Sequence, residues 1–443
     1  MSDPRIAPWL SESNWPTAPI RLVARLGSGH TPSRNKPEYW QNCTTPWITL
    51  ADVWQLRSGQ KSTITETKEK INSLGEANSA AVKHPAGTVI LSRTASVGFS
   101  AIMGRDMATS QDFATWTCGP RLEPRYLLHA LRGMAPDLKR VATGSTHKTI
   151  YMPDIEQLRV PLPPLDEQRR IADFLDAETA RIDRLRELHE RQQSLTKEAA
   201  FRRVYDAVRG AHVKGPRKDS GLNWLGAIPA DWRVGAVSHY FEVELGKMLN
   251  QERAQGDHLR PYLRVANVQW DRIDISNLAR MNFPPNERVR YRLQAGDLLV
   301  NEGGSWPGRA AVWSGEISEI YYQKALHRIR SRGEELPRWL YYCLVAAERL
   351  RVFQVQGNTS TMTHLTREQL RPQRFPFPDL STQRELVAEL DSGADREARF
   401  QRLLDRQLGL LTERRQALIT AAVTGQFDVS TASGRNVTDG VLT

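Results

Sequence analysis

The chain has 443 residues, of which 40% are hydrophobic and 25% charged, an ordinary balance for a globular protein long enough for about three domains. Its net charge of +11 favours a polyanionic partner, and the plain alternative is a soluble protein that is merely rich in arginine. No run approaches the ~20 apolar residues of a membrane-spanning helix. Three widely spaced cysteines exclude a disulfide framework and a thiolate zinc site. We therefore expect a cytoplasmic protein without a membrane partner.

The first part of the chain predicts a mixed domain. Residues 1–20 hold four prolines and are expected to form an irregular lead-in. Over 21–165, short β-type runs such as Pro46–Ile48 and Thr88–Leu91 alternate with loops that contain Gly and Pro. One helix is predicted over 124–140, where apolar residues recur at helical spacing. These features are typical of an α/β module made of short strands.

A long charged helix is predicted next, within a helical spacer at 166–210. Residues 166–209 contain neither Pro nor Gly, so a single helix could reach roughly 65 Å. Asp166 is expected to cap it and Gly210 to end it. Its apolar residues are spaced three, four and seven apart, which is typical of a helix that packs on another helix. These expected pairing residues are Ile171, Leu175, Ile182, Leu185, Leu188 and Leu195.

The second half of the chain repeats this organisation. A basic linker over 211–225 leads to a second mixed domain at 226–380 and a second helical spacer at 381–429. Ser381 or Thr382 is expected to cap the second helix, and the stretch around Gly393 is expected to kink or break it. The polar residues 430–443 are expected to be disordered. The pairing residues predicted in this helix are Leu390, Phe400, Leu404, Leu411 and Leu418.

A sequence repeat connects the two halves. PLPPLDEQRRIADFLD at 161–176 matches PFPDLSTQRELVAELD at 376–391, with one constant offset and no gap. Solenoid repeats are only about 20–50 residues long, so this is a duplicated domain. The predicted fold class is α+β: two duplicated mixed α/β domains, separated and joined by long helices that pair as an antiparallel coiled coil about a pseudo-two-fold axis. Two similar modules would suit a DNA duplex with two half-sites.

No catalytic constellation emerges from the residues. Gly27-Ser28-Gly29 lacks the third glycine of a nucleotide loop and is interpreted as a turn. Asn282-Phe283-Pro284-Pro285 has the letters of an adenine-methyltransferase motif in the wrong order and is interpreted as a loop. Asp297 is better explained as a turn residue than as a metal ligand with Glu302. We therefore predict no catalytic residues, no metal site and no cofactor bound by this chain.

DNA readers need Arg and Lys for phosphates, and Arg, Lys, Asn, Gln, Ser or Thr for base edges. Several loops of both modules have this composition, although surface loops in general often do. Their recurrence at matching places favours DNA binding. The candidates in the first module are Arg34, Asn35, Lys36, Arg93, Thr94, Gln111, Ser145, Thr146, His147 and Lys148. Those in the second module are Arg264, Asn267, Asn301, Ser305, Trp306, Arg309, Gln323, Lys324, Asn358, Thr359 and Ser360.

These residues resemble a known family, the specificity subunits of type I restriction-modification enzymes. The likeness spans about 20–430 and includes LGSGHTPSRN at 26–35, AGTVILSRTASVG at 86–98, AGDLLVNEGGSWPGR at 295–309, DSGLNWLGAIPADW at 219–232 and ERRQALITAAVTGQFDV at 413–429. Both Pro-to-Gln-Arg entries into the long helices are similar to its conserved helical regions.

The resemblance implies a non-catalytic subunit with two target recognition domains. Each would read one half of a bipartite, asymmetric site in double-stranded DNA, and the helices would fix the spacing between halves. Two modification subunits would dock on the helices, where the residues predicted for helix pairing would also serve subunit docking, and would methylate adenine N6 with S-adenosylmethionine. Restriction subunits would add ATP- and Mg²⁺-dependent translocation and cleavage.

Two other functions stay open from the sequence. A coiled-coil scaffold that binds two proteins and no DNA would share the long helices, but the basic charge argues against it. A self-contained DNA methyltransferase or nuclease would need the catalytic motifs that we do not find.

Overall fold

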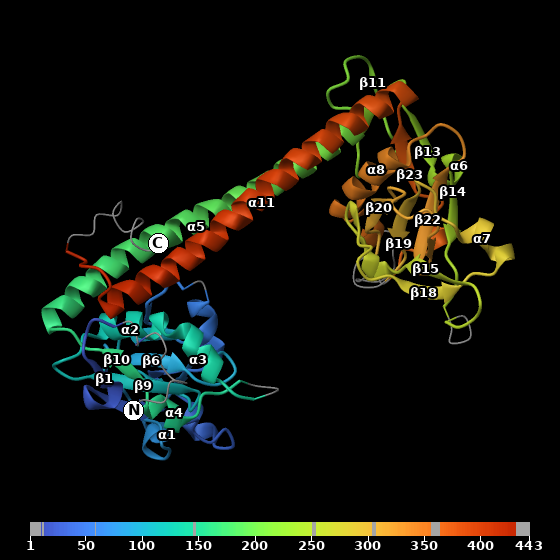
Figure 1. Ribbon diagram of the computed structural model, residues 1–443. Coiled ribbons are helices and arrows are strands. Elements are labelled where there is room, and N and C mark those ends of the chain that lie inside the picture. The colour runs from blue at the N-terminus through green and yellow to red at the C-terminus, as the bar shows by residue number, and fades with distance from the viewer. Residues whose placement is uncertain are drawn as a thin grey trace. The chain divides into compact units, whose positions relative to one another are not determined.

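The computed structural model describes residue 10 and residues 13–57, 59–144, 148–249, 254–303, 307–355 and 364–430. It divides into two units (Figure 1). Unit 1 comprises Met1–Arg191 with Leu404–Thr443, and unit 2 comprises Gln192–Leu403. Two long helices, α5 (Leu165–Val208) and α11 (Leu380–Thr424), contribute residues to both units.

Unit 1 is built on a five-stranded sheet with the order β2-β9-β6-β7-β4, in which only β4 and β7 are parallel. Its strands are β2 (Ala24–Ser28), β9 (Phe113–Cys118), β6 (Val89–Ser92), β7 (Ser100–Met103) and β4 (Thr63–Ile64). A second sheet consists of β5 (Glu69–Ile71), β3 (Thr45–Ile48) and β8 (Ala108–Thr109), and a third pairs β1 (Thr17–Pro19) with β10 (Arg159–Pro161). The helices, besides the long ones, are α1 (Ser73–Ala77), α2 (Pro124–Gly133), α3 (Ala135–Val141) and α4 (Met152–Glu156).

Unit 2 repeats this plan with a four-stranded sheet of order β14-β22-β19-β20. Its strands are β14 (Phe241–Leu245), β22 (Leu326–Ser331), β19 (Leu298–Asn301) and β20 (Ala310–Val312). The smaller sheets join β18 (Ala279–Asn282), β15 (Leu259–Leu263) and β21 (Tyr321–Tyr322); β13 (Arg233–Ala236) and β23 (Arg374–Phe377); β11 (Arg217–Asp219) and β12 (Ala227–Pro229); and β16 (Val268–Gln269) and β17 (Arg272–Ile273). The helices are α6 (Val237–Tyr240), α7 (Pro285–Tyr291), α8 (Pro337–Arg349), α9 (Val352–Val355) and α10 (Arg367–Leu370).

Hydrophobic burial explains why the long helices are part of each unit. Strand β6 is Val-Ile-Leu-Ser and is buried at every position, as expected of a central strand covered on both faces. Helix α2 packs on β6 and β7 and starts with Pro124, whose ring fits the first turn of a helix. Ile171 and Leu175 of α5 and Ile419 of α11 are fully buried in the same core as these elements. Each unit therefore closes its core with parts of both long helices.

The predicted duplication is confirmed down to individual hydrogen bonds. Gln168 of α5 is completely buried, and its Oε1 accepts a hydrogen bond from the backbone N–H of Glu123, which precedes α2, at 2.9 Å. Gln383 of α11 is equally buried, and its Oε1 accepts from the N–H of Leu336, which precedes α8, at 3.1 Å. Each glutamine also donates at 2.9 Å to the carbonyl of a proline five residues earlier. The same side chain therefore anchors each long helix to its module.

Both units also share a second hydrogen bond that anchors the long helix, although a tyrosine makes it in unit 1 and a tryptophan in unit 2. The Tyr126 hydroxyl donates to the carbonyl of Pro161 at 3.0 Å, and the Trp339 indole donates to the carbonyl of Pro376 at 2.8 Å. Tyr126 and Trp339 occupy equivalent places in α2 and α8. Both anchors position the first turns of α5 and α11 against their own module.

The long helices run antiparallel within each unit, as predicted. In unit 1, Asp183 forms an ion pair with Arg415, and His189 Nε2 lies 2.9 Å from Gln407 Oε1. In unit 2, Glu397 forms an ion pair with Arg203 at 3.6 Å. In unit 1 the partner number on α11 falls as the number on α5 rises, which is the signature of an antiparallel pair.

Several local predictions are wrong at the ends of elements. Helix α5 begins at Leu165, so Asp166 lies in its first turn and is not its cap. Asp379 takes the capping role at α11, where its carboxylate accepts hydrogen bonds from Thr382 N at 3.1 Å and from Thr382 Oγ1 at 2.6 Å. Helix α11 continues through Gly393 without a break, because packing against α5 outweighs the low helix propensity of glycine.

Segments expected to be irregular also contain structure. Thr17–Pro19, in the predicted lead-in, form strand β1, and Arg217–Asp219, in the predicted linker, form strand β11. Gly27 and Ser28 belong to strand β2, so the predicted turn is a strand end. The helix predicted over 124–140 is two helices, α2 and α3, which meet at Met134. Asn282 ends β18 and so is not part of a loop.

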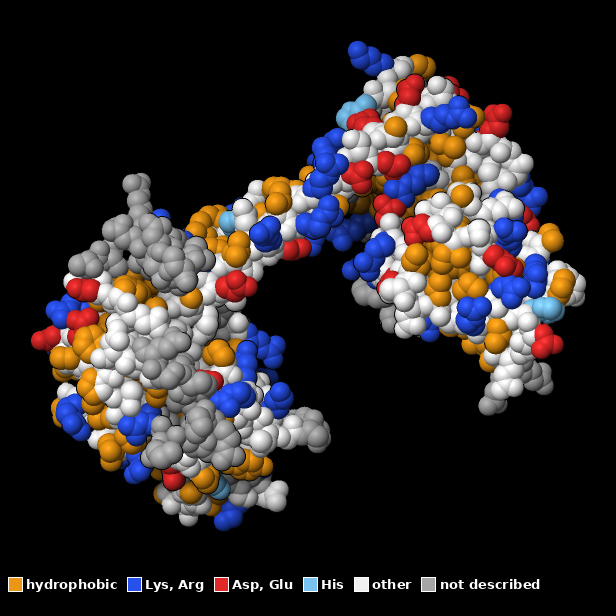
Figure 2. Space-filling view, in the orientation of Figure 1, with side chains coloured by type: hydrophobic (Ala, Val, Ile, Leu, Met, Phe, Trp, Pro, Cys, Tyr) orange, Lys and Arg blue, Asp and Glu red, His pale blue; other side chains and the backbone are white. Residues whose placement is uncertain are grey.

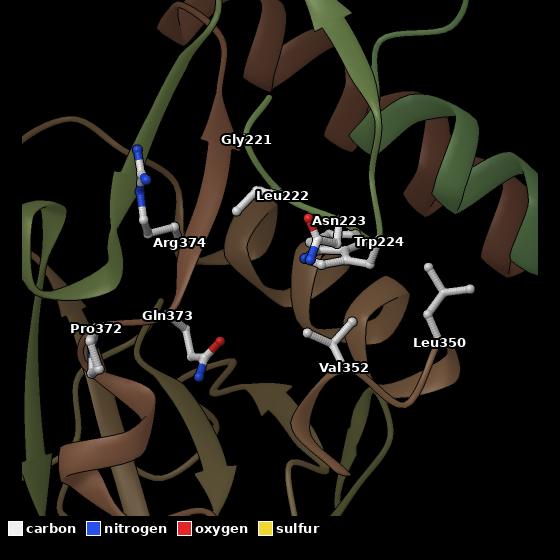
Figure 3. A pocket seen from close by; sticks show the side chains of 9 residues that line it. All are labelled: Gly221, Leu222, Asn223, Trp224, Leu350, Val352, Pro372, Gln373 and Arg374. Carbon is white, nitrogen blue, oxygen red and sulfur yellow. The ribbon is translucent and has the colours of Figure 1, made fainter. Parts of the chain in front are cut away.

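Another part of the predicted linker lines a pocket in unit 2. Residues 221–224 form one wall of a cavity of about 540 Å³, and Leu350 and Arg374 lie on other sides of it (Figure 3). Gly210 follows the end of α5 with a φ of 61°, in agreement with its predicted role as the stop. Residues 431–443, predicted to be disordered, lie outside the described part of the chain.

Candidate nucleic-acid interface

In unit 1, the predicted reading loops meet at one end of the five-stranded sheet. Strand β6 ends at Ser92, which pairs with Phe113 at the start of the antiparallel strand β9. The loop after Ser92 is held by two backbone hydrogen bonds, from Arg93 N to Asp112 O at 2.8 Å and from Ala95 N to Lys148 O at 2.9 Å. Three loops far apart in sequence therefore form one surface.

The loop after β2 joins this surface. The Thr31 hydroxyl donates to Gln111 Oε1 at 2.7 Å, and the N–H of His30 donates to the carbonyl of Thr109 at 3.0 Å. Gly29 makes this approach possible, because a Cβ at that position would lie 1.8 Å from the carbonyl oxygen of Thr109.

Unit 2 assembles the equivalent loops in the same way. The N–H of Glu302 donates to Ala325 O at 3.0 Å, and the N–H of Lys324 donates to Lys247 O at 2.9 Å. An isolated bridge joins Gly303 to His364, at the place where unit 1 joins Thr94 to Thr149. The two units thus present matched loop clusters at matched ends of their sheets.

Gly246 has the same role in unit 2 as Gly29 in unit 1. A Cβ on Gly246 would lie 2.3 Å from the carbonyl oxygen of Gln323, on the equivalent strand-end loop. The sequence analysis missed both glycines as positioning residues. Their shared place after the first strand of each module was the signal that could have found them.

The predicted candidates differ widely in exposure. Six are exposed and free to meet a ligand from solvent: Arg34, Asn35, Lys36, Gln111, Lys148 and Lys324. Five are half-buried: Arg93, Thr94, Arg264, Arg309 and Gln323. Two are buried: Asn267 and Asn301. Eight lie outside the described residues: Ser145, Thr146, His147, Ser305, Trp306, Asn358, Thr359 and Ser360.

The buried asparagines serve the fold of their own loops. Asn267 accepts a hydrogen bond from Arg264 N at 2.9 Å and donates to Asp274 O at 2.8 Å, so its amide holds the turn after β15. Asn301 is 1% exposed, and its Nδ2 donates to Val268 O at 3.4 Å. Their burial argues against direct contact with a base edge.

Exposed cations are held in place by neighbouring side chains. The guanidinium of Arg34 lies 3.9 Å from the centre of the Trp40 ring and forms an ion pair with Glu69 at 2.6 Å. Lys36 donates to the Tyr39 hydroxyl at 3.2 Å, and this hydrogen bond raises the pKa of Lys36. Figure 2 shows Lys and Arg side chains at the surface of both units.

Unit 2 holds a cation that the sequence analysis did not single out. Lys247, next to Gly246, is 3% exposed and lies over the Phe283 ring at 5.1 Å from its centre. Its ammonium group donates to the carbonyl of Asn282 and forms an ion pair with Glu287. Lys247 therefore fixes the base of the loop cluster.

The carboxylates considered for a metal site have other roles. Asp297 is 2% exposed and accepts two hydrogen bonds from Arg330, at 2.7 and 2.6 Å. Burial raises the pKa of Glu302. Among the described residues, no three His, Cys, Asp or Glu side chains are grouped as metal ligands. In the same part of the chain, none of the helices is long and apolar enough to cross a membrane.

The predicted helix-pairing residues fall into two groups. Ile171, Leu175, Ile182, Leu390, Leu404 and Leu418 are buried, and Phe400 and Leu411 are half-buried, as expected. Leu185, Leu188 and Leu195 are exposed by 39%, 46% and 56%, so they do not pair the helices. Polar residues such as Arg186 and His189 are more buried there. The prediction placed the wrong face of α5 against α11. The two helices contact each other along a stripe that does not contain these three leucines.

Comparison with known proteins supports this resemblance. Residues 12–193 match the family model described as the type I restriction modification DNA specificity domain. The resemblance to type I specificity subunits is confirmed.

Curated relatives in this family are distant. The chain is 25% identical to the MjaIX specificity subunit of Methanocaldococcus jannaschii over 268 residues, which is 58% of each chain. It is 29% identical to the Escherichia coli EcoR124I/EcoR124II specificity subunit over 37% of this chain and 40% of that one. The chain is 20% identical to the EcoKI specificity subunit of E. coli K12, over 66% of this chain and 62% of that one. The matched part thus spans about three fifths or less of these relatives' length.

Solved structures share the fold over most of the chain. A chain from a study of complex assembly and conformational transition in the type I R-M system aligns with a TM-score of 0.71 and 19% identity, over 93% of this chain and 98% of that one. The HsdS subunit from Thermoanaerobacter tengcongensis aligns with a TM-score of 0.53 and 19% identity, over 93% and 97%. Two mixed α/β modules with paired long helices are therefore a fold that this chain shares with these structures.

Proposed function

We propose that this chain is the DNA-specificity subunit of a type I restriction-modification complex and does no covalent chemistry itself. Each module would read one half of a bipartite, asymmetric site in double-stranded DNA. The observation that carries this proposal is the matched convergence of reading loops, marked by the bridges Thr94–Thr149 and Gly303–His364. Because loop residues differ between modules on a common framework, the two half-sites should differ in sequence.

Charge supports a DNA partner. The net charge of +11 suits a polyanion, and the exposed loop cations Arg34, Lys36, Lys148 and Lys324 lie at the converging ends or next to them. Cations at these positions would hold phosphates, while neighbouring polar side chains would meet base edges. The side chains that read individual bases stay a prediction.

The long helices offer surfaces for protein partners. In unit 1, Leu185, Leu188 and Leu410 are exposed by 39%, 46% and 54%, and in unit 2, Leu195 and Leu403 are exposed by 56% and 60%. Exposed leucines on an otherwise charged helix would suit a docking surface if a partner covers them together. We infer that modification subunits dock there, one on each unit's part of the helices, and supply S-adenosylmethionine and adenine-N6 methyl transfer.

The helices would also set the spacer between the two half-sites. Restriction subunits with ATP and Mg²⁺ would complete the complex, in the cytoplasm. In this proposal the cofactors belong to the partner subunits, and this chain supplies sequence choice and assembly.

The experiment that tests the function is a methylome. Cells would carry the neighbouring modification gene with and without this chain. A split N6-methyladenine motif that appears only with the chain is the expected result, and it would give both half-sites at once. An unchanged methylation pattern, with the modification subunit expressed and bound, would contradict the proposal and favour the scaffold function.

A further inference from the structure

Unit 1 contains a basic cleft between its module and the long helices. Its volume is about 690 Å³, and its walls come from Leu56, Arg57 and Gly59, from residues 98–100, from α2 and α3, and from α5 and α11. Among the described side chains that line it, one carboxylate, Glu413, stands against five cations. These are Arg57, Arg132, Lys139, Arg186 and Arg415. We call this the basic cleft of unit 1.

The contacts inside the cleft leave most of this charge without a counterion. Arg132 donates to the Ser62 hydroxyl at 3.1 Å and to the carbonyl of Lys61 at 3.0 Å, both neutral acceptors. Arg415 has one carboxylate nearby, Asp183, at 3.3 Å. Burial, and secondarily the charge of Arg415, lower the pKa of Arg132 to about 10.

Arg186 has spare hydrogen-bonding capacity at the same place. Its Nε is buried and has no hydrogen-bond partner among the described residues, and its guanidinium reaches the Glu190 carboxylate only at 4.0 Å. A buried donor without an acceptor is costly. An anion in the cleft would supply both the acceptor and the missing negative charge.

The matching module of unit 2 is built without these cations. The equivalent positions of unit 2 follow from aligning Tyr126 with Trp339 and Gln168 with Gln383, the matched anchors of the two units. Uncharged residues stand there: Val345 for Arg132, Val352 for Lys139, Ala200 for Arg415 and Gln401 for Arg186. Val345 and Val352 belong to the hydrophobic core cluster of that unit or pack against it. At these four positions the positive charge is therefore found in unit 1 alone, which points to a ligand.

The position of the cleft indicates which anion it takes. Gly98, Phe99 and Ser100 line it, and they directly continue the loop from Arg93 to Val97 that belongs to the reading surface. A duplex lying on that loop would carry its sugar-phosphate backbone past the cleft mouth. An acidic protein surface would satisfy the charge equally well, but nothing in the walls selects a peptide.

We propose that the basic cleft of unit 1 binds backbone phosphate of the DNA duplex next to the half-site that this module reads. The proposal rests on the proposed function, since it needs a duplex on the reading loops. The cleft contributes affinity without sequence preference, because arginine and lysine contacts to phosphate are the same at every base pair. Because unit 2 lacks the matching cations, the chain would also bind the two half-sites with unequal affinity.

The test uses the exposed cations of the cleft, because variants of the half-buried Arg132 could misfold. Full-length chain carrying Arg57→Ala and Lys139→Ala would be co-purified with its modification subunit. Binding to a duplex with the methylome-derived site and to a duplex with a scrambled site would be measured at salt concentrations from about 50 to about 200 mM. The control, Lys214→Ala with Lys218→Ala, removes the same charge from an exposed segment of unit 2.

We expect the cleft variant to bind both duplexes roughly tenfold or more weakly, with a salt slope lower by about two, since each lost phosphate contact removes about 0.9 from the slope. The control should leave slope and affinity nearly unchanged. An unchanged slope in the cleft variant would overturn the cleft proposal while leaving the function intact. Loss of the modification subunit with unchanged DNA binding would also overturn it, in favour of an acidic protein surface. If the wild-type complex prefers neither duplex, the proposed function itself fails.

Discussion

The two units hold their long helices with the same hydrogen bonds but pack them with different chemistry. Gln168 and Gln383 make matching anchors. Beyond the anchors, unit 1 places Ile182 of α5 and Leu418 of α11 in its hydrophobic core. At the positions that the repeat makes equivalent, unit 2 has an ion pair between Glu397 and Arg203.

Unit 2 also leaves space between its helices. A cavity of about 120 Å³ lies between the helices, and small residues such as Ala200, Gly393 and Ala394 form part of its lining. The side chain of Arg203 is 51% exposed, so its ion pair adds little stability. The comparison teaches that the anchors fix where a long helix starts on its module, whereas the packing further along is free to diverge. We therefore expect the helix junction of unit 2 to be the weaker one.

The largest expected contrast is between the two cross-helix ion pairs. Asp183→Ala in unit 1 should cost about 3 kcal/mol of unfolding free energy, because Arg415, whose side chain is 15% exposed, would lose its carboxylate. Glu397→Ala in unit 2 should cost less than about 1 kcal/mol, since Arg203 can be solvated and burial already raises the pKa of Glu397. Hydrogen exchange of the amides of α2 and α8 at increasing urea concentration would measure the unfolding free energy of each unit separately. Equal losses would show that the junctions are equally tight.

A substitution in the cavity of unit 2 sharpens the comparison at smaller scale. Gly393→Ala should stabilise unit 2 by about 1 kcal/mol, because alanine is the better helix former and its Cβ would meet nothing closer than 3.9 Å. Gly409→Ala, on the exposed side of α11 in unit 1, is the matched control and should stabilise unit 1 by a similar amount. Thermal unfolding of the two variants would measure both gains in stability. A loss at Gly393 alone would mean that the helix bends there.

The smallest expected contrast is in pH dependence. Burial, and secondarily Arg132, lower the pKa of His129, although its 2.8 Å hydrogen bond to Asp176 acts the other way. The folded imidazole is therefore neutral while the unfolded one gains a proton below about pH 6.5, so unit 1 should lose stability as the pH falls from 7 through 6.5.

The equivalent residue of unit 2 is Tyr342, which donates to Asp391 and has a raised pKa, so it does not titrate in this range. Burial also lowers the pKa of His84 in unit 1 and of His327 in unit 2, so each unit has one further histidine that acts in the same direction. Hydrogen exchange at pH 5 and 7, corrected for intrinsic exchange rates, would test whether unit 1 loses more stability than unit 2 as the pH falls. His129→Gln should remove the excess loss in unit 1, and parallel curves in the wild type would contradict the prediction.

Much of the fold could be predicted because its signals are local. The repeated Pro-to-Gln-Arg entry indicated two modules, and the absence of Pro and Gly over 166–209 predicted α5 to within one residue at each end. Element ends were less predictable. Asp379 caps α11 from one residue before the helix, and the predicted lead-in pairs with Arg159–Pro161, at the far end of the first module's sequence. Such pairings have no local signature.

The candidate interface was predictable by composition but not by exposure. Both Arg34 and Asn301 lie in polar loops, yet Arg34 is exposed and Asn301 is 1% exposed. The basic cleft was not predicted, because Arg57, Arg132, Arg186 and Arg415 come from four separate segments. Only folding brings them together.

The sequence by itself determined the duplication and the extents of the long helices, because repeats, periodicity and Pro or Gly residues at element ends are local signals, and it also carried the family resemblance. Only the tertiary structure decided which stripe of each helix faces its partner. Leu185 and Leu188 have the spacing of a seam, yet His189 meets Gln407 of the other helix. Hydrophobic periodicity reports that a face can be buried, but the anchors at Gln168 and Gln383 fix how each helix is rotated and therefore which face it presents.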